Sequence, residues 1–341
     1  MTFVNNQSTP AVWFPTIKAG TGTDVFTIRL VKALKKRGIK ADITWLPHRA
    51  EYAPWSVSRP LPPRWANVVH VNSWLPKRFV PQNLPFVVTT HLCVHDHPFL
   101  TPYKDFVRRL YHRLWIKHCE AQNILHASKV TAVSQYTARQ TTQVFGRSDI
   151  EVIYNWIDTE IYTPVLRPHP HDPFHLLFVG KPSRRKGSDL LLTIMERLGS
   201  EFELRYTGLP QDLGKAKLPS NIIPIGHLKD ETALIEAYQN ADALLFPSRL
   251  EGFGLVMLEA QAIGRPAIAT NGSSLSEVAI QNQTGLLCPI DDSDAFANAA
   301  RILRESPKRW RKMCENAAVH AKGRFAEKPA IDAWIDLYRR I

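Results

Sequence analysis

Two glutamates with seven residues between them, Glu251 and Glu259, are the side chains whose type and spacing best indicate chemistry. They frame the segment EGFGLVMLE, which follows the apolar run ALLFPSRL. That run is typical of a buried parallel strand, and residues 255–263 have the apolar density of a packed helix. A strand that ends near Pro247 would deliver Glu251 into the crevice at the carboxyl ends of a parallel sheet, where open α/β sheets bind ligands.

The glycine-bearing turn between the glutamates would let a ligand approach the backbone closely. The amides of Phe253, Gly254 and Leu255 would lie at the amino end of the predicted helix, where roughly half a positive charge favours a diphosphate. Glu259 lies about one turn further in, at about 1.5 Å rise per residue, where it can face a ribose while Glu251 faces a second sugar. Carboxylates suit sugar hydroxyls and not phosphate, so the segment predicts a site for a nucleotide sugar.

A second segment, FVGKPSRRKGSD at residues 178–189, carries cations. We expect Gly180 at a strand end, Lys181 and Lys186 on the loop that follows, and Gly187 just before a helix. Cations at the carboxyl edge of a sheet can neutralise a phosphate, and a lysine does so as a point charge. A solvated surface loop is the alternative interpretation of this run when it stands alone.

The densest acidic cluster is Asp291, Asp292 and Asp294, and it begins a predicted helix. Its position indicates helix capping and not a metal site. Two lysines and oriented amides can stabilise the charge of a leaving diphosphate without a metal. We therefore expect neither a metal nor a resident cofactor.

Two segments of the first half of the chain also carry candidate residues. The GTGTD loop, residues 20–24, precedes a helical pattern as an anion-binding loop would, and Gly22 is its candidate residue. The loop lacks the third glycine of a dinucleotide fingerprint, which argues against NAD binding. The segment TTHLCVHDHP places His91, His95 and His97 just after a predicted strand. The alternation of His95 and His97 is compatible with a metal site, but no further ligand pattern supports one.

Short β-rich runs alternate with helical segments along the whole chain, which predicts an α/β fold with parallel sheets. A length of 341 residues is long for one core and natural for two Rossmann-like domains. The predicted parts are an amino-terminal domain, a proline-rich linker, a second domain and a final helix, at residues 1–163, 164–173, 174–326 and 327–341.

The apolar runs, the amino-terminal segment and the cysteines indicate where in the cell the protein is expected. No run of 18 apolar residues occurs, and the amino terminus MTFVNNQSTP lacks the regions of a signal peptide, so we expect a cytoplasmic protein. The four cysteines are far apart in the sequence, which argues against a zinc cluster or a disulfide framework.

The net charge of +12 is concentrated in the first half of the chain. Residues 1–164 hold 20 Lys+Arg and 10 Asp+Glu, whereas residues 165–341 hold 23 and 21. A basic domain attracts anionic lipid headgroups, nucleic acid or an anionic acceptor without specifying which. Residues 102–126 form a basic, aromatic amphipathic helix that could lie in a headgroup region. A core-facing apolar stripe with a solvated basic face is the alternative.

The sequence resembles the family 4 retaining glycosyltransferases of the two-domain GT-B fold, whose mark is two glutamates separated by seven residues in this context. The resemblance extends over nearly the whole chain. It implies two Rossmann-like domains that face each other across a cleft. In this arrangement the first domain binds the acceptor, the second binds the nucleotide sugar, and the final helix crosses back to the first.

The resemblance also implies roles for residues of the second domain. It assigns Glu251 to donor-sugar hydroxyls, the amides of residues 253–255 to the diphosphate, and Glu259 to the ribose. Gly180 matches the family's glycine. Lys181 and Lys186 match its two basic residues, although the first of these is usually arginine.

In the first domain, His91 matches the family's histidine that reaches the donor sugar, and hydrogen bonding within its own loop is the alternative. Gly22 matches a glycine pair that lets the backbone approach donor and acceptor. A threonine separates Gly20 from Gly22, so this match is less close.

These implications predict a retaining, metal-independent hexosyl- or N-acetylhexosaminyl-transferase that uses a UDP- or GDP-linked sugar. The expected acceptor is a glycan or a lipid-linked glycan of polysaccharide, lipopolysaccharide or glycolipid synthesis in the cell envelope. We expect the enzyme to be peripheral on the inner face of the membrane. Nucleic acid is not expected as a partner. An epimerase of the same fold, which would act on the nucleotide sugar without an acceptor, is the enzymatic rival. A basic surface-binding protein without turnover is the rival from another class.

Overall fold

The computed structural model describes three stretches of the chain, residues 9–95, 106–214 and 218–341. They form two compact units, each with its own six-stranded sheet. Unit 1 comprises the chain up to Asn155 together with Glu327–Ile341, and unit 2 comprises Trp156–Ala326. The stretch 164–173, predicted as a linker, therefore belongs to unit 2. Each unit is described here by itself.

The sheet of unit 1 has the order β2-β1-β3-β4-β5-β6, and every neighbouring pair of strands is parallel. Its strands are β1 (Ala11–Ile17), β2 (Lys40–Leu46), β3 (Val68–Asn72), β4 (Phe86–Thr90), β5 (Lys129–Ala132) and β6 (Ile150–Val152). All five residues of β3 are buried, as expected for a parallel strand covered on both faces. The sequence analysis did not predict β6, because three partly buried residues at a sheet edge carry too little apolar pattern.

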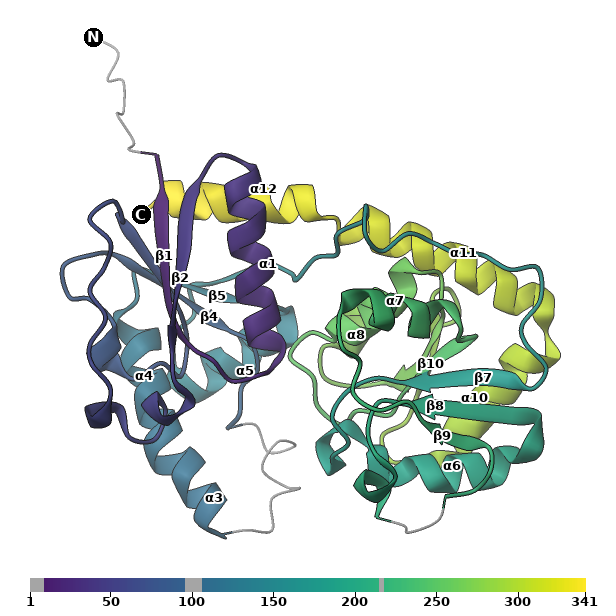
Figure 1. The fold of residues 1–341 in the computed structure, drawn as a ribbon. Coiled ribbons are helices and arrows are strands. Elements are labelled where there is room, and N and C mark those ends of the chain that lie inside the picture. The colour runs from purple at the N-terminus through teal and green to yellow at the C-terminus, as the bar shows by residue number, and fades with distance from the viewer. Residues whose placement is uncertain (1–8, 96–105, 215–217) are drawn as a thin grey trace. The chain divides into compact units, whose positions relative to one another are not determined.

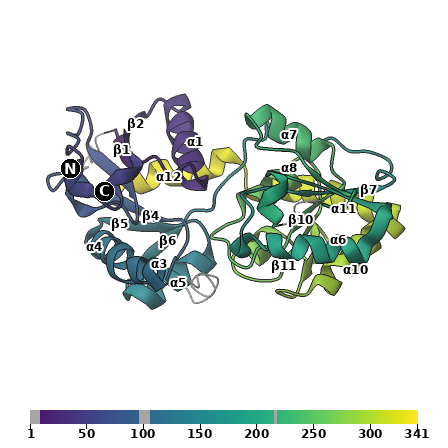
Figure 2. The same ribbon diagram turned by 60° about the horizontal axis from the view of Figure 1, so that its bottom comes forward.

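Helices cover both faces of this sheet: α1 and α12 lie on one face, and α4 and α5 on the other (Figures 1 and 2). The helical elements of unit 1 are α1 (Gly22–Lys36), η1 (His48–Ala50), η2 (Pro54–Ser56), η3 (Lys77–Phe79), α3 (Phe106–Tyr111), the π-helical turn η4 (His112–Ile116), α4 (Lys117–His126), α5 (Gln135–Phe145) and α12 (Glu327–Arg339). The described part of the predicted helix at 102–126 is therefore three consecutive pieces.

The sheet of unit 2 has the order β12-β11-β10-β7-β8-β9 and is also parallel throughout. Its strands are β7 (Phe174–Phe178), β8 (Phe202–Tyr206), β9 (Ile222–Pro224), β10 (Ala243–Phe246), β11 (Ala267–Thr270) and β12 (Gly285–Cys288). Its helical elements are η5 (Arg184–Lys186), η6 (Ser188–Leu190), α6 (Leu191–Leu198), η7 (Gly199–Glu201), η8 (Pro210–Leu213), α7 (Glu231–Gln239), α8 (Leu255–Ala262), α9 (Leu275–Val278), α10 (Ser293–Glu305) and α11 (Pro307–Arg324). Figures 1 and 2 show α7 and α8 on one side of the sheet and α6 and α10 on the other.

Each sheet has one point where the direction of strand addition reverses. In unit 2 the chain adds β8 and β9 beside β7, and then crosses over to add β10, β11 and β12 on the other side. In unit 1 the same reversal falls between β1 and β3. Open α/β sheets bind ligands at the carboxyl ends of the strands that flank such a switch point. The two sheets, parallel throughout, confirm the predicted α/β class.

The final helix, α12, packs within unit 1. The Tyr338 hydroxyl lies 2.7 Å from Nδ1 of His70, which is buried in β3, and Arg340 forms an ion pair with Glu151 at 2.8 Å. Pro329 lies in the first turn of α12, where a missing N–H removes no helical hydrogen bond. None of the helices in the described residues has the length and apolar character needed to span a bilayer.

Candidate functional site

Three loops of unit 2 converge on Glu251, and they follow the adjacent strands β7, β10 and β11. The side chain of Glu251 accepts hydrogen bonds from Lys186 Nζ at 2.7 Å and from Ser248 Oγ at 2.6 Å. Its backbone N–H donates to Ser273 Oγ at 3.1 Å, and its carbonyl accepts from Ser274 Oγ at 2.9 Å. Glu251 is therefore fixed through both its side chain and its backbone, at the switch point of the sheet.

Arg185 is a member of this cluster that the sequence analysis did not single out. Its Nη1 lies 3.3 Å from Glu251 Oε1 and donates to the Leu250 carbonyl at 2.8 Å. The sequence signal was its place in the run SRRKG beside Lys186. Lys181, which was predicted, has an exposed side chain, and no hydrogen bond or ion pair joins it to Glu251 in the described part of unit 2.

The central carboxylate of the cluster is nearly buried, since only 8% of Glu251 is exposed. Burial raises the pKa of the Glu251 carboxyl, but Lys186, Arg185 and the hydrogen bonds outweigh it, so the pKa lies below its ordinary value. Burial and the charge of Arg185 lower the pKa of Lys186, against the opposite influence of Glu251. With Glu251 and Arg185 ionised, Lys186 in its charged form gives the cluster two cations against one carboxylate. That excess of positive charge suits a diphosphate better than a neutral ligand.

At two positions, a close contact and a positive φ require the residue to be glycine. Gly187 has a φ of +70°, and a Cβ added there would lie 2.0 Å from the Pro247 carbonyl oxygen. Only glycine therefore lets the loop after β7 dock on the loop after β10. Gly254 has a φ of +98°, and a Cβ there would lie 2.8 Å from Leu275 Cδ2, so the turn before α8 has the same restriction.

Arg249, in the loop after β10, also contacts the loop after β7. Its guanidinium pairs with Asp189 at 2.7 Å and with Asp291 at 2.6 Å, and its backbone N–H donates to the Arg185 carbonyl at 2.8 Å. Of the acidic cluster interpreted as capping, Asp292 does cap α10 by accepting from the Ala295 N–H at 2.9 Å. Asp291 does not act as a cap, because its carboxylate is paired with Arg249.

The other predicted residues of unit 2 lie around α8 and at the end of β7. Gly254 is the residue before α8 and Leu255 is its first residue. The Phe253 side chain is buried, with its ring 5.6 Å from that of Phe325, so Phe253 would meet a ligand only through its backbone. Gly180 follows β7, and its N–H donates to Thr207 Oγ1 at 2.7 Å.

Glu259 lies within α8 and is 5% exposed. The hydroxyl of Tyr238, from the end of α7, lies 3.1 Å from Glu259 Oε2 and orients the carboxylate. The sequence analysis did not predict this partner, because a tyrosine in a neighbouring helix has no fixed spacing from its acceptor.

His91 belongs to unit 1 and follows β4. Its Nε2 lies 3.0 Å from Asn72 Oδ1, and the Phe26 ring lies edge-on with its centroid 4.6 Å from that of His91. Burial lowers the pKa of His91 to about 3, so the imidazole is neutral near pH 7. This hydrogen-bond partner lies on β3 and not in the loop that carries His91, and the role of His91 towards the donor sugar stays a prediction.

Gly22 is the first residue of α1, and a Cβ added there would meet open space. The glycine that the backbone requires is Gly20, with a φ of +67°. The Asp24 carboxylate accepts from the N–H groups of Gly20 at 2.7 Å and Ala19 at 3.1 Å. The amide of Gly20 in the predicted anion-binding loop, and that of Ala19 just before it, are therefore satisfied by the chain's own carboxylate, and a ligand role for Gly22 stays a prediction.

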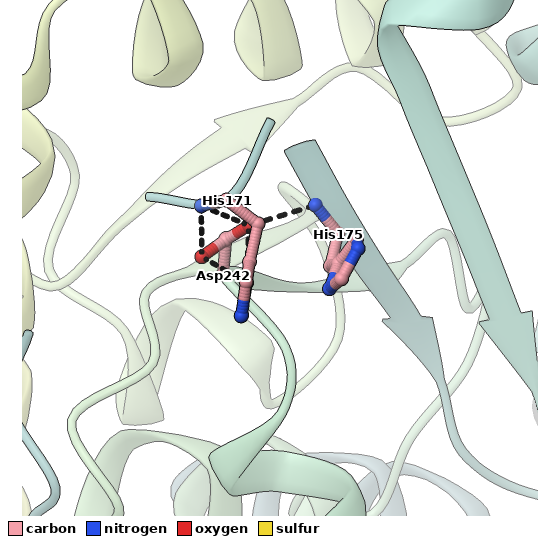
Figure 3. Close-up of side chains that lie close together, drawn as sticks. All are labelled: His171, His175 and Asp242. Carbon is pink, nitrogen blue, oxygen red and sulfur yellow. Dashed lines mark hydrogen bonds and ion pairs between the residues drawn. The ribbon is translucent and has the colours of Figure 1, made fainter. Parts of the chain in front are cut away.

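Two histidine clusters lie in the described part of the chain, and both contain ion pairs within the protein. His95 Nε2 lies 2.7 Å from Glu120 in a buried pair, and His97 lies outside the described residues. His171, His175 and Asp242 gather at the other end of β10 from Glu251 (Figure 3).

Arg167 already supplies a cation to that second cluster. Its guanidinium is 2.6 Å from Asp242 and 2.9 Å from His171 Nε2, and Asp242 also accepts from the backbone N–H of His175 at 2.7 Å. This geometry ties residues 164–173 to β10 and favours a structural role.

Sequence comparison places the chain in a family. The family profile "Glycosyltransferase Family 4" matches residues 20–161, and the profile "Glycosyl transferases group 1" matches residues 166–320. Together they cover most of the chain, including Gly22 and His91 in one match and Lys186, Glu251 and Glu259 in the other. The chain belongs to glycosyltransferase family 4, and its two parallel sheets are those of the GT-B fold.

Among curated relatives, the chain is similar to D-inositol 3-phosphate glycosyltransferase 1 of Catenulispora acidiphila, with 29% identity over 64% of this chain and 59% of that one. The chain spans about half the length of the curated relatives it matches.

Two solved structures show the likeness of fold. Sucrose-phosphate synthase from Thermosynechococcus elongatus has a TM-score of 0.77 and 19% identity, over 96% of this chain and 98% of that one. Anabaena Alr3699/HepE, solved in complex with UDP, has a TM-score of 0.72 and 15% identity, over 97% of this chain and 100% of that one.

Proposed function

We propose that the chain is a glycosyltransferase that moves a sugar from a nucleotide-diphosphate sugar, UDP- or GDP-linked, to an acceptor hydroxyl, with retention of anomeric configuration and without a metal ion. The observation that carries the proposal is the cluster of Glu251, Lys186 and Arg185 at the switch point of unit 2. A neighbouring structure of the same fold, HepE, has been solved with UDP-glucose, which supports a uridine nucleotide as the first donor to test.

The proposed chemistry follows from the charges of the site. As the anomeric bond breaks, negative charge develops on the leaving diphosphate, and Lys186, Arg185 and the amides at the start of α8 stabilise it. Removing one such donor typically lowers kcat by about 10²–10³. The carboxylates of Glu251 and Glu259 accept hydrogen bonds from the hydroxyls of the transferred sugar and the ribose. His91 contributes a neutral imidazole on the donor-sugar side.

The stereochemistry of slow donor hydrolysis tests this proposal without knowledge of the acceptor. The purified chain is incubated with UDP-glucose in EDTA, and the released sugar is followed by NMR before it mutarotates. Initial release of the α-anomer from the α-linked donor agrees with retention, whereas β-glucose would contradict it. An epimerised nucleotide sugar would favour the rival epimerase. No turnover in the presence of candidate acceptors would favour the surface-binding rival.

We further propose a lipid-linked or otherwise anionic acceptor of the cell envelope, and a membrane surface as the place of reaction. The apolar residues Phe106, Val107, Leu110 and Leu114 of α3 and η4 are 42–72% exposed, which supports this proposal over the alternative of a core-facing stripe. Arg109 is exposed on the same helical segment. Exposed apolar side chains beside arginines suit an anionic headgroup region.

Vesicle binding tests the membrane proposal separately from catalysis. We expect the chain to float with vesicles that contain phosphatidylglycerol and to bind less to pure phosphatidylcholine. The double substitution Val107→Glu and Leu114→Glu should release it, while Val319→Glu, at an equally exposed position of unit 2, should not. Equal flotation of all variants would contradict a membrane role for α3 and η4.

A further inference from the structure

Asn72, at the end of β3, is the hydrogen-bond partner of His91 and is itself held from two sides. Its side chain is 6% exposed and lies between His91 Nε2 at 3.0 Å and Thr16 Oγ1 at 2.9 Å. The amide nitrogen donates to Thr16, at the end of β1, which turns the amide oxygen towards His91. Two adjacent strands thus orient one amide towards the imidazole.

An amide oxygen accepts hydrogen bonds and cannot donate them. His91 must therefore carry a hydrogen on Nε2, and in a neutral imidazole the other nitrogen, Nδ1, is then an acceptor. Phe26 packs against the ring and helps to fix its orientation. His70 is a titratable side chain in the same part of unit 1, and burial and His91 lower its pKa to about 3, so it brings no positive charge near pH 7.

We propose that Asn72 is a positioning residue that fixes the tautomer of His91, so that His91 presents an unprotonated Nδ1 as a hydrogen-bond acceptor to the donor sugar. This inference rests on the proposed function, because it concerns the same site. A neutral sugar hydroxyl can donate to Nδ1, whereas a carboxylate cannot. On the proposed function, His91 would therefore favour a donor that places a neutral hydroxyl beside Nδ1 over a uronic acid that places a carboxylate there.

The first experiment reads the tautomer in the full chain without any nucleotide. Two-bond ¹H–¹⁵N correlation spectra of ¹⁵N-histidine-labelled protein distinguish the two neutral tautomers and imidazolium, and the His91→Gln variant assigns the signal among 13 histidines. We expect a neutral imidazole with its hydrogen on Nε2 between pH 6 and pH 8. A hydrogen on Nδ1 would overturn the proposal.

The second experiment changes the partner. Asn72→Asp keeps the size of the side chain and places a carboxylate beside Nε2, which favours imidazolium and raises the pKa of His91. We expect His91 to titrate at a higher pH than in the wild type, and kcat/KM for UDP-glucose to fall on the order of tenfold at acid pH as Nδ1 becomes a donor. Asn67→Asp, at an asparagine before the same strand that bonds to Thr9 and Ala11, is the matched control.

The two readouts separate this inference from the proposed function. An unchanged pH profile and an unchanged ratio of kcat/KM for UDP-glucose to that for UDP-glucuronate in Asn72→Asp would overturn the positioning role. A wild-type chain that turns over no nucleotide sugar would contradict the proposed function, and the NMR spectra would still decide the tautomer. Circular dichroism of both aspartate variants monitors the fold.

Discussion

At the level of single residues, the proposed site contains a carboxylate, Glu251, that stays ionised although it is nearly buried. Glu251 does so because Lys186 and Arg185, from one loop, share its charge. The loss of one partner from such a buried pair is strongly destabilising, by about 3–5 kcal/mol, because it leaves charge uncompensated. Since two cations are present here, one remains after a single substitution, and we expect a smaller effect on stability than on ligand binding.

Arg185 and Arg184 offer a matched test of this cluster. Arg185→Met should weaken binding of a nucleoside diphosphate by at least about tenfold, because a charged hydrogen-bond donor of the site is lost. Arg184→Met, whose exposed side chain belongs to the same loop, should bind nearly as the wild type does. Fluorescence or calorimetric titration of both variants measures the difference. Equal affinities for the two would mean that Arg185 only supports the fold.

Part of this cluster could be predicted from the sequence. Glu251 and Lys186 were predicted because a glycine turn and a K-G pair are local patterns that predict a place at a strand end. Arg185, Ser248, Ser273 and Tyr238 were not. Their roles depend on which loops meet in space, and nothing local in the sequence distinguishes them from ordinary surface residues.

At the scale of elements, the site depends on the docking of the turn at η5 against the loop after β10. This docking requires the absence of a side chain at Gly187, where the backbone of Pro247 passes. Apart from β6, the strands of both sheets were predictable, since short β-branched runs between helical patterns are a strong signal. The edge strand β6 and the π-helical turn η4 were not, because both are set by tertiary packing.

Gly187→Ala should disrupt this docking. Gly214 is the matched control, because its φ of +72° and ψ of 13° are close to those of Gly187, +70° and 20°, but a Cβ there would meet open space. Both alanine variants carry the strain of the left-handed conformation, about 1–2 kcal/mol, and only Gly187→Ala adds the clash with Pro247. We expect nucleotide affinity to fall at least tenfold in Gly187→Ala alone. Equal losses of affinity in the two variants would contradict the docking account.

At the scale of the whole molecule, the final helix joins the core of unit 1 through a buried histidine. His70 Nδ1 lies 2.7 Å from the Tyr338 hydroxyl, and its Nε2 lies 2.6 Å from Thr89 Oγ1. Both ring nitrogens are thus engaged, and burial and the charge of His91 lower the pKa of His70 to about 3. The two-domain α/β organisation was predictable from length and periodicity. The boundary at Trp156 was not, since the proline-rich stretch 164–173 is bound by Asp242 within unit 2.

This histidine makes stability depend on pH. The unfolded histidine titrates near its ordinary pKa of about 6.5. Below that pH, His70 of the unfolded chain is protonated, whereas His70 of the native chain stays neutral down to about pH 3. The stability that neutral His70 contributes is therefore present above pH 6.5 and lost progressively towards pH 3, by about 2 kcal/mol at pH 5.

Urea unfolding at pH 7 and pH 5, for the wild type and His70→Gln, measures this effect. Glutamine does not titrate, so the difference in unfolding free energy between the two proteins should shrink by about 2 kcal/mol at the lower pH. If the two units unfold separately, the comparison uses the transition that the variant shifts. A difference that is the same at both pH values would contradict a buried, neutral His70.

We expect unit 2 to bind a nucleoside diphosphate through Lys186 at the switch point of its sheet. Calorimetric titration of the full chain with UDP, GDP, ADP and their common sugars, in EDTA, tests it most directly. We predict that one nucleotide binds clearly, that Lys186→Ala loses at least tenfold in affinity, and that Lys181→Ala loses less. Absence of binding to every nucleotide, or equal binding by Lys186→Ala and the wild type, would contradict the account.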